Sequence, residues 1–161
     1  MRQTVFFPVL AVLFSVGFAV PAAFAHCEIP CGIYDDGMKF RELSQHADTI
    51  EKSVREIRAL EASGKPDMNQ LVRWINNKDA HADRIKEEVA DYFLSQRVKL
   101  PEGEAERGDY GRQLELLHRI TVYAMKTKQT VDPENVRLLR ESLEAYRELY
   151  EKLHGHGPEG T

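Results

Sequence analysis

Residues 38–62, MKFRELSQHADTIEKSVREIRALEA, decide the fold of this chain. The apolar side chains in this stretch recur at alternating steps of three and four, which places them on one face of an α-helix. These are Phe40, Leu43, Ala47, Ile50, Val54, Ile57 and Leu60. The stretch therefore predicts an amphipathic helix that buries one stripe and exposes its charged face.

A second helix follows after a clear break. Gly64 and Pro66 end the first helix, and Asp67 with Gln70 has the spacing of a capping box that begins the next one. The apolar stripe of this second helix is Leu71, Ile75, Ala82, Ile85, Val89 and either Tyr92 or Phe93. The polar stretch 99–108, with Pro101 and Gly103, indicates the longest loop of the domain.

Two further helices complete the pattern. The third is expected over residues 109–129, with an apolar stripe of Leu114, Leu117, Thr121 and Ala124, widened by Leu116, Ile120 and Tyr123. The fourth begins with Asp132 as the N-cap and Pro133 at the first helical position, and its stripe is Val136, Leu139, Leu143, Tyr146, Tyr150 and Leu153. Four amphipathic helices joined by short loops predict an all-α, antiparallel, up-and-down four-helix bundle.

Residues 1–25 have the pattern of an export signal. Arg2 is followed by an almost wholly apolar stretch over residues 5–20, and Ala23 and Ala25 are the small residues that a signal peptidase requires. A transmembrane helix is the alternative, because the apolar stretch approaches the length that spans a bilayer. A proline and the small-residue site follow it, however, and no positive cluster does. We expect signal peptidase to cut after Ala25, which leaves no membrane segment and an exported chain, periplasmic or extracellular.

The composition limits the class of partner. The chain has 161 residues, with 22 basic and 26 acidic side chains and a net charge of −4, and cleavage would remove only one of those charges, a positive one. This length supports one domain with a core of its own. A net negative chain without a clustered excess of Lys and Arg argues against nucleic acid as a partner.

Cleavage after Ala25 would place several metal donors together. His26 would carry a free α-amine as well as its imidazole, and the Cys27 and Cys31 thiols would lie directly behind it, with Pro30 stiffening the turn between them. With the amine, the Cys27 amide nitrogen and two sulfurs in one plane and the imidazole above it, this set suits nickel or copper better than tetrahedral zinc. A local disulfide between the two cysteines is the alternative.

The string His-Cys-x-x-Pro-Cys-Gly-x-Tyr, from His26 to Tyr34, resembles the nickel hook of the nickel-containing superoxide dismutases. The resemblance implies a four-helix bundle that assembles as a homohexamer. It also implies one nickel ion per subunit, with His26, Cys27 and Cys31 as the ligands and Tyr34 guarding the open face of the metal.

The resemblance extends into the bundle. It implies that the carboxylate of Glu42 orients the axial imidazole, and that Tyr92 packs against the hook tyrosine. Taken alone, Glu42 would be a solvated helix residue and Tyr92 a core residue. Some members of the family place an arginine near the imidazole and carboxylate. The corresponding stretch here is Asn76-Asn77-Lys78-Asp79, to which no such role is assigned.

The implied activity is the disproportionation of superoxide to oxygen and hydrogen peroxide through a Ni(II)/Ni(III) cycle. The alternative is a non-catalytic exported protein that binds nickel or copper through the same hook. Tyr34 and Glu42 favour the enzyme, because a carrier needs neither a guarded open face nor an oriented axial ligand. The remaining histidines are scattered along the sequence and receive no role: His46, His81, His118, His154 and His156.

The sequence therefore predicts four consecutive parts. Residues 1–25 are a cleaved signal peptide, and residues 26–36 form the N-terminal nickel hook. Residues 37–154 form the four-helix bundle. Residues 155–161, rich in glycine, form a disordered tail.

Overall fold

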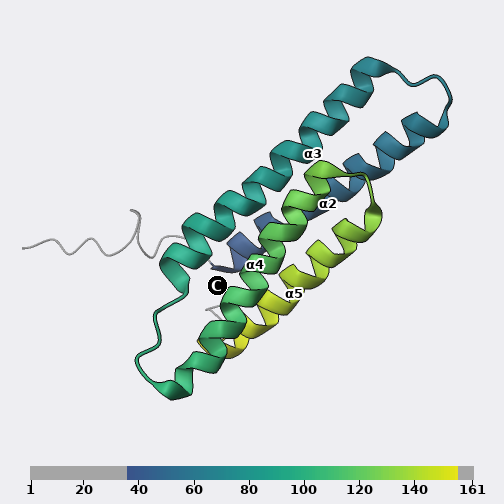
Figure 1. Ribbon diagram of the computed structural model, residues 1–161. Coiled ribbons are helices and arrows are strands. Elements are labelled where there is room, and N and C mark those ends of the chain that lie inside the picture. Colours follow the sequence, from purple (N-terminus) through teal and green to yellow (C-terminus); the bar gives the residue numbers. More distant parts are fainter. Residues whose placement is uncertain (1–35, 156–161) are drawn as a thin grey trace, which may run out of the picture.

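The computed structural model describes residues 36–155, and over that range every regular element is a helix (Figure 1). The long helices are α2 (Asp36–Ala62), α3 (Met68–Glu88), α4 (Arg107–Gln129) and α5 (Pro133–His154). A π-helix, η1 (Val89–Arg97), directly continues α3, and a 3₁₀ turn, η2 (Glu104–Glu106), precedes α4. The four expected helices are confirmed, with α2 and α4 each beginning two residues earlier than predicted.

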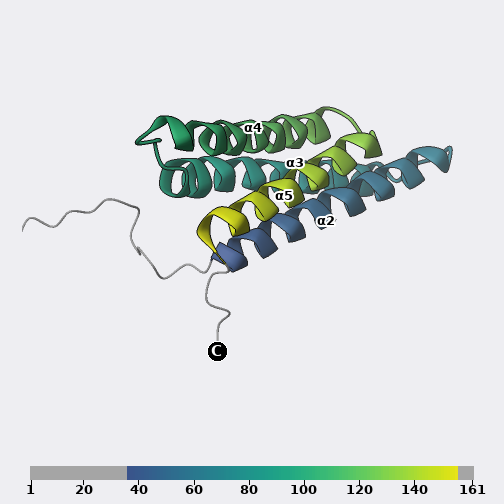
Figure 2. The same cartoon turned by 90° about the horizontal axis from the view of Figure 1, so that it is seen from below.

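The helices form an antiparallel bundle in which each packs against the next and α5 closes against α2 (Figures 1 and 2). Side-chain contacts give the directions. Across α2 and α5, Tyr150 binds Asp36 whereas Arg140 binds Glu51, so residue numbers rise on one helix as they fall on the other. This confirms the up-and-down four-helix arrangement.

The N-terminal residues of α3 and α5 confirm both predicted caps. The Asp67 carboxylate accepts hydrogen bonds from the backbone N–H groups of Asn69 (2.9 Å) and Gln70 (3.2 Å). The Asp132 carboxylate accepts one from the N–H of Glu134 (3.0 Å), with Pro133 following the cap. These carboxylates satisfy N–H groups that have no partner within their own helix.

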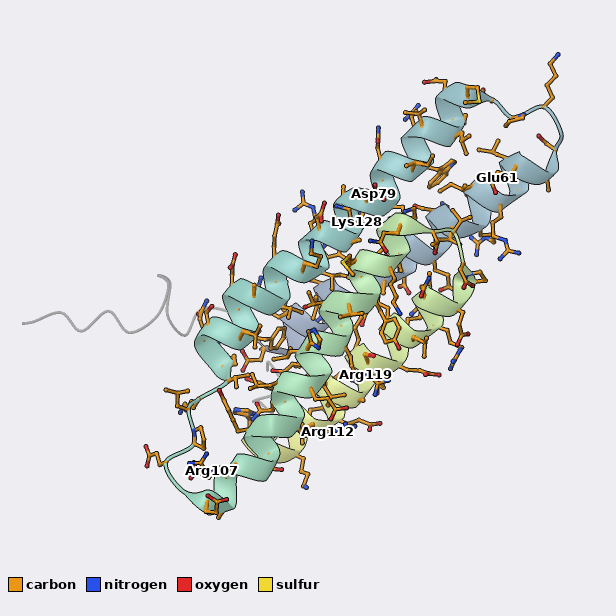
Figure 3. All side chains as sticks on the ribbon, viewed as in Figure 1. Glu61, Asp79, Arg107, Arg112, Arg119 and Lys128 are labelled. Carbon is orange, nitrogen blue, oxygen red and sulfur yellow. The ribbon has the colours of Figure 1, made fainter. Side chains whose placement is uncertain are left out.

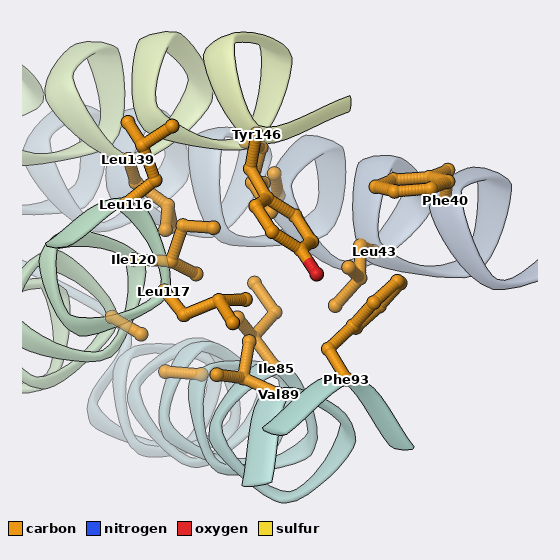
Figure 4. Packing of buried hydrophobic residues seen from close by; sticks show 14 of the residues in the cluster. Phe40, Leu43, Ile85, Val89, Phe93, Leu116, Leu117, Ile120, Leu139 and Tyr146 are labelled. Atoms are coloured by element: carbon orange, nitrogen blue, oxygen red, sulfur yellow. The ribbon is translucent and has the colours of Figure 1, made fainter. Parts of the chain in front are cut away.

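The core lies along the bundle axis, where the four stripes meet (Figure 4). The predicted stripes of α2 and α5 are buried, apart from the half-buried terminal residues Leu60 and Leu153. Of the stripe predicted for α4, Leu116, Leu117, Ile120 and Ala124 are buried, whereas the prediction is wrong for Leu114 and Thr121, which are only half-buried. The buried line of α4 is Gln113, Leu116, Leu117, Ile120, Ala124 and Thr127. With so many apolar residues in that segment, two adjacent helix faces have similar hydrophobicity, and packing selects between them.

The α2–α3 hairpin extends beyond the α4–α5 connection (Figures 1 and 2). Its tip therefore has no helix opposite, and Met68, Val72 and Ile75 are 61%, 50% and 37% exposed. The prediction that Ile75 belongs to the buried stripe is wrong for this reason. The periodicity identified the inward face of α3 but contained no information on how far α4 and α5 reach.

A buried lysine joins α3 to the end of α4. Lys78 is 2% exposed, and its ammonium donates to the backbone carbonyls of Thr127 (2.5 Å) and Lys128 (2.9 Å) and to the carboxylate of Asp79 (2.7 Å). Figure 3 labels Asp79 and Lys128 at this junction. The last carbonyls of a helix have no partner within it, so Lys78 closes α4 from the neighbouring helix.

No helix within residues 36–155 combines the length and the apolar character needed to cross a membrane.

Candidate metal centre

The predicted metal ligands His26, Cys27 and Cys31, together with Pro30 and Tyr34, lie outside the described residues. Two of the predicted site residues, Glu42 on α2 and Tyr92 on η1, lie within them. The described chain begins at Asp36, two residues after the predicted hook tyrosine. The start of α2 and its surroundings are therefore the part of the bundle that adjoins the predicted hook.

Asp36 is the centre of a hydrogen-bonded cluster at this end of the bundle. One carboxylate oxygen accepts from the Tyr92 hydroxyl and from Arg97 Nε (2.9 Å), and the other accepts from the Tyr150 hydroxyl (2.6 Å). Arg97 Nη2 also donates to the Tyr92 oxygen (2.6 Å). Three elements, α2, η1 and α5, thus supply one connected network, which we call the Asp36 cluster: Asp36, Tyr92, Arg97 and Tyr150.

The protonation states in the Asp36 cluster follow from these contacts. Burial disfavours the carboxylate, but the hydrogen bonds from Tyr150, Tyr92 and Arg97 outweigh it and hold the pKa of Asp36 below its usual value. Burial and the hydrogen bond to that carboxylate raise the pKa of Tyr92 to about 12. At neutral pH Asp36 is therefore ionised and Tyr92 is a protonated phenol that donates to it.

The π-helix is what brings Arg97 to Tyr92. These residues are five apart, and in an α-helix a separation of five rotates the second by about 140° from the first. Hydrogen bonds of the i to i+5 type bring such residues nearly into line. The guanidinium of Arg97 accordingly lies 4.5 Å from the centre of the Tyr92 ring, within the range of a cation–π contact.

Side chains inside η1 also bond across five residues. Ser95 Oγ donates to the carbonyl of Ala90 (2.6 Å), and Gln96 Nε2 donates to the carbonyl of Asp91 (3.0 Å). The backbone N–H of Val98 donates to the carbonyl of Phe93 (3.0 Å). These bonds satisfy carbonyls at the end of the helix and stabilise the wider turn.

Aromatic rings support the Asp36 cluster from inside the bundle. Phe93 is fully buried, and its ring centre lies 4.9 Å from that of Phe40 and 5.2 Å from that of Tyr146. Figure 4 shows Tyr146 extending from α5 toward Phe93 and Leu43. The Tyr146 hydroxyl is buried and has no hydrogen-bond partner among residues 36–155. A buried hydroxyl in this position is a polar group that a segment outside the described residues could satisfy.

Glu42 lies one to two turns further along α2 and has a cationic neighbour. The ammonium of Lys39 lies 3.1 Å from the Glu42 carboxylate and 2.6 Å from that of Glu88 on α3. The same ammonium lies 5.4 Å from the centre of the Tyr92 ring. The Glu42 side chain is 43% exposed, so its carboxylate is positioned by Lys39 yet remains accessible. The cation beside this carboxylate is Lys39 of α2 itself, whereas Lys78, in the stretch Asn76-Asn77-Lys78-Asp79, binds the end of α4.

Sequence reasoning identified Glu42 and Tyr92 but missed Asp36, Arg97, Tyr150 and Lys39. A spacing of five has no significance in an α-helix, so no pattern linked Arg97 to Tyr92. The contacts of Asp36 join residues 56 to 114 positions apart, which no local motif encodes. Among residues 36–155 there is no group of three or more His, Cys, Asp and Glu side chains arranged to hold a metal ion.

Comparison with known proteins adds one finding. A family model described as nickel-containing superoxide dismutase matches residues 21–153 of this chain. No curated protein and no solved structure matches it. The matched range covers the predicted hook and all four helices of the bundle.

Proposed function

Because this chain belongs to the nickel-containing superoxide dismutases, we propose that it converts superoxide to oxygen and hydrogen peroxide at an N-terminal hook formed by residues 26–36. The protein is an oxidoreductase whose cofactor is nickel. The observation that supports the finer proposal is the Asp36 cluster, a polar network in which three side chains of the bundle hold Asp36, two residues after Tyr34. The non-catalytic carrier is not pursued, because the family is enzymatic.

The donor set of the hook fits nickel. His26 offers an α-amine and an imidazole, and Cys27 and Cys31 offer two thiolates, a mixture of nitrogen and soft sulfur donors that suits a tetragonal ion. When bound, nickel supplies a one-electron Ni(III)/Ni(II) couple that oxidises one superoxide to oxygen and reduces another, with two protons, to hydrogen peroxide. The same donors in the folded protein must also be protected from the peroxide product, which oxidises thiolates.

The Asp36 cluster contributes fixed hydroxyl groups to this reaction. Arg97, paired with Asp36, lies over the Tyr92 ring, and Lys39, paired with Glu42 and Glu88, lies beside that ring. The hydrogen bonds to Asp36 and Arg97 hold the Tyr92 hydroxyl in one orientation. We propose that Tyr92 in this fixed position supports Tyr34, the hook residue that guards the open face, and helps to exclude bulk water.

Glu42 is proposed to fix the axial imidazole. Lys39 holds its carboxylate from one side while nearly half of the Glu42 side chain stays exposed, which leaves an acceptor free for the His26 ring N–H. A carboxylate that accepts from a ligating histidine sets the orientation of the ring and raises its basicity. Replacement of Glu42 by Gln should therefore weaken turnover more than nickel content. Glu87→Gln, at an exposed position of α3, is the matched control.

Maturation and assembly are further parts of the proposal. Signal peptidase would cut between Ala25 and His26 during export, to the periplasm or the cell exterior, and thereby create the α-amine ligand. The mature subunits would assemble as homohexamers. The exposed apolar side chains of Met68, Val72 and Ile75 at the tip of the α2–α3 hairpin support an assembly in which they are covered.

The decisive experiment varies only the position of the N-terminus. Mature protein that begins at His26 is compared with a form that carries one extra alanine before His26, both purified with nickel present. We expect the first to bind one nickel per chain and to accelerate superoxide decay in pulse radiolysis. The second should fold identically by circular dichroism but show only background decay. Equal activity of the two forms would overturn the α-amine as a ligand, and inactivity of both would overturn the hook as the catalytic centre.

A further inference from the structure

Two histidines that are far apart in sequence meet between α2 and α3. His46 Nδ1 lies 2.9 Å from His81 Nδ1, with ring centres 4.9 Å apart and ring planes inclined by 63°. Both side chains are half-buried. The sequence analysis treated these histidines as scattered. The antiparallel packing of the two helices instead places them opposite each other, two turns along the same seam from the Lys39–Glu88 ion pair.

The contact leaves a lone pair on at least one of the two Nδ1 atoms. Only one proton fits between two nitrogens at this distance, so at least one Nδ1 presents a lone pair to the other ring. Burial lowers the pKa of both histidines. Arg84 lowers both further, and His81 also lowers the pKa of His46, against the opposing effect of the Glu42 and Glu88 carboxylates. The pair is therefore neutral at neutral pH, and neutral imidazole is the usual metal ligand among side chains.

The spacing of the nitrogens matches two adjacent positions of one metal ion. For metal–nitrogen bonds of about 2.0–2.1 Å, ligands at right angles are separated by about 2.9 Å, whereas tetrahedral ligands are separated by about 3.3 Å. The observed 2.9 Å therefore fits the square-planar or octahedral geometry of divalent nickel and copper. Without a metal, the same contact is a hydrogen bond between the two rings.

We propose that His46 and His81 form a second metal site, which binds one divalent nickel or copper ion through both Nδ1 atoms. Residues 36–155 supply no third ligand, so water completes the coordination, and the half-exposed side chains allow its access. Glu42 and Glu88 contribute negative charge nearby, and Arg84 opposes it. The site is independent of the hook, because His46 is a full turn beyond Glu42 and uses none of the hook ligands.

The test removes the hook side chains and keeps the rest of the mature chain. In a His26→Ala, Cys27→Ser, Cys31→Ser background, nickel chloride is titrated by isothermal calorimetry into protein with His46→Gln, His81→Gln or neither. We expect one nickel per chain, bound at least about 10–100-fold more weakly after either substitution, since loss of only an outer-shell partner costs that much. His118→Gln, at an exposed position of α4, is the matched control and should leave binding unchanged.

A spectroscopic measurement on the background protein with both histidines present does not depend on whether the histidine variants fold. Copper(II) bound to the same background should show superhyperfine coupling to two equivalent imidazole nitrogens in electron paramagnetic resonance. Coupling to fewer than two, or equal nickel affinity in the His46→Gln and His118→Gln proteins, would overturn the site. Because the background lacks the hook, neither result depends on whether the hooked enzyme is active.

Discussion

Two charged side chains, Asp36 and Lys78, join the helices of this bundle at different places, and their partners differ in kind. Lys78 donates mainly to backbone carbonyls at the end of α4 and is 2% exposed. Asp36 accepts from three side chains on two elements, remains about one-third exposed and directly follows the hook sequence. The first arrangement satisfies the end of a helix, whereas the second holds ionisable groups in position at the start of the bundle.

The comparison shows that buried polar contacts in this bundle have two different causes. Backbone carbonyls at a helix end must find a donor somewhere, so the Lys78 contacts meet a requirement that the fold itself creates. The Asp36 contacts meet no such requirement, since Tyr92, Tyr150 and Arg97 could each be apolar without leaving a helix end unsatisfied. Variants that separate effects on stability from effects on turnover distinguish the role of Lys78 from that of Asp36.

Replacement of Lys78 by Met should have the largest effect on stability and none on chemistry. Methionine fills a similar volume, but two buried carbonyls lose their donor, and we expect the free energy of unfolding to fall by about 3 kcal/mol. Urea denaturation followed by circular dichroism measures this. The control is Lys128→Met, which removes an ammonium paired with Asp83 at 30% exposure and should cost under about 1 kcal/mol. Turnover per bound nickel should not change in either variant.

Equal stability of the Lys78→Met and Lys128→Met proteins would contradict the structural role of Lys78. A loss of turnover per nickel in folded Lys78→Met protein would instead place this lysine in the catalytic machinery and remove the contrast with Asp36.

Replacement of Asp36 by Asn should have a smaller effect on stability but a clear effect on turnover. The asparagine amide keeps one oxygen acceptor. Its N–H₂ group replaces the other oxygen and faces hydroxyl or guanidinium groups that are themselves donors. With hydrogen bonds to a partly exposed carboxylate lost, we expect about 2 kcal/mol less stability. Superoxide decay per bound nickel should fall because Tyr92 and Arg97 lose their common anchor. Asp48→Asn, where the carboxylate is 61% exposed and paired with Arg140, is the control for both measurements.

Unchanged turnover per nickel in the Asp36→Asn protein would show that the Asp36 cluster, like Lys78, only supports the fold. A loss of nickel content rather than turnover would move the role of Asp36 from the reaction to hook assembly.

Replacement of Tyr92 by Phe should change how stability depends on alkaline pH. The pKa of Tyr92 is raised to about 12 in the folded protein, above the ordinary value of 10, so the folded state holds the phenol proton more tightly. This contribution is fully present below pH 10 and is lost as the pH rises toward 12. Between pH 9 and pH 11 we expect the wild type to lose about 1 kcal/mol more than the Tyr92→Phe protein. Urea denaturation at pH 9 and pH 11 measures the difference, and parallel pH profiles would contradict it.

The sequence contained most of the fold and only part of the site. The helices, their order and the caps at Asp67 and Asp132 follow from local patterns, because periodicity and capping act within a few residues. The uncertainty between Tyr92 and Phe93 in the second stripe had a physical cause. A wider π-helical turn buries both, along with Val89, and no period of 3.6 describes it.

The remaining site residues depend on distances that no local pattern encodes. Glu42 and Tyr92 could be assigned because a specific motif elsewhere in the chain implied partners for them. The contact between Asp36 and Tyr150 forms only because the fold brings the first and last helices of the bundle, α2 and α5, side by side. The same holds for His46 and His81, whose contact requires the register of α2 against α3.

The smallest effects are expected in the second helical segment, which consists of regular α3 and π-helical η1. Asp67→Ala removes the cap of α3, where the exposed backbone N–H groups of Asn69 and Gln70 turn to water, and should cost about 1 kcal/mol. Ser95→Ala removes a bond to the carbonyl of Ala90 and should cost only about 0.5 kcal/mol. If the π-helix η1 aligns Arg97 with Tyr92, however, Ser95→Ala should lower turnover more than Asp67→Ala does, although it costs less stability. Hydrogen exchange of the η1 amides and superoxide decay per nickel would test this together. Faster exchange with unchanged decay would mean that the π-helix tolerates fraying and that Asp36 alone fixes the position of Arg97.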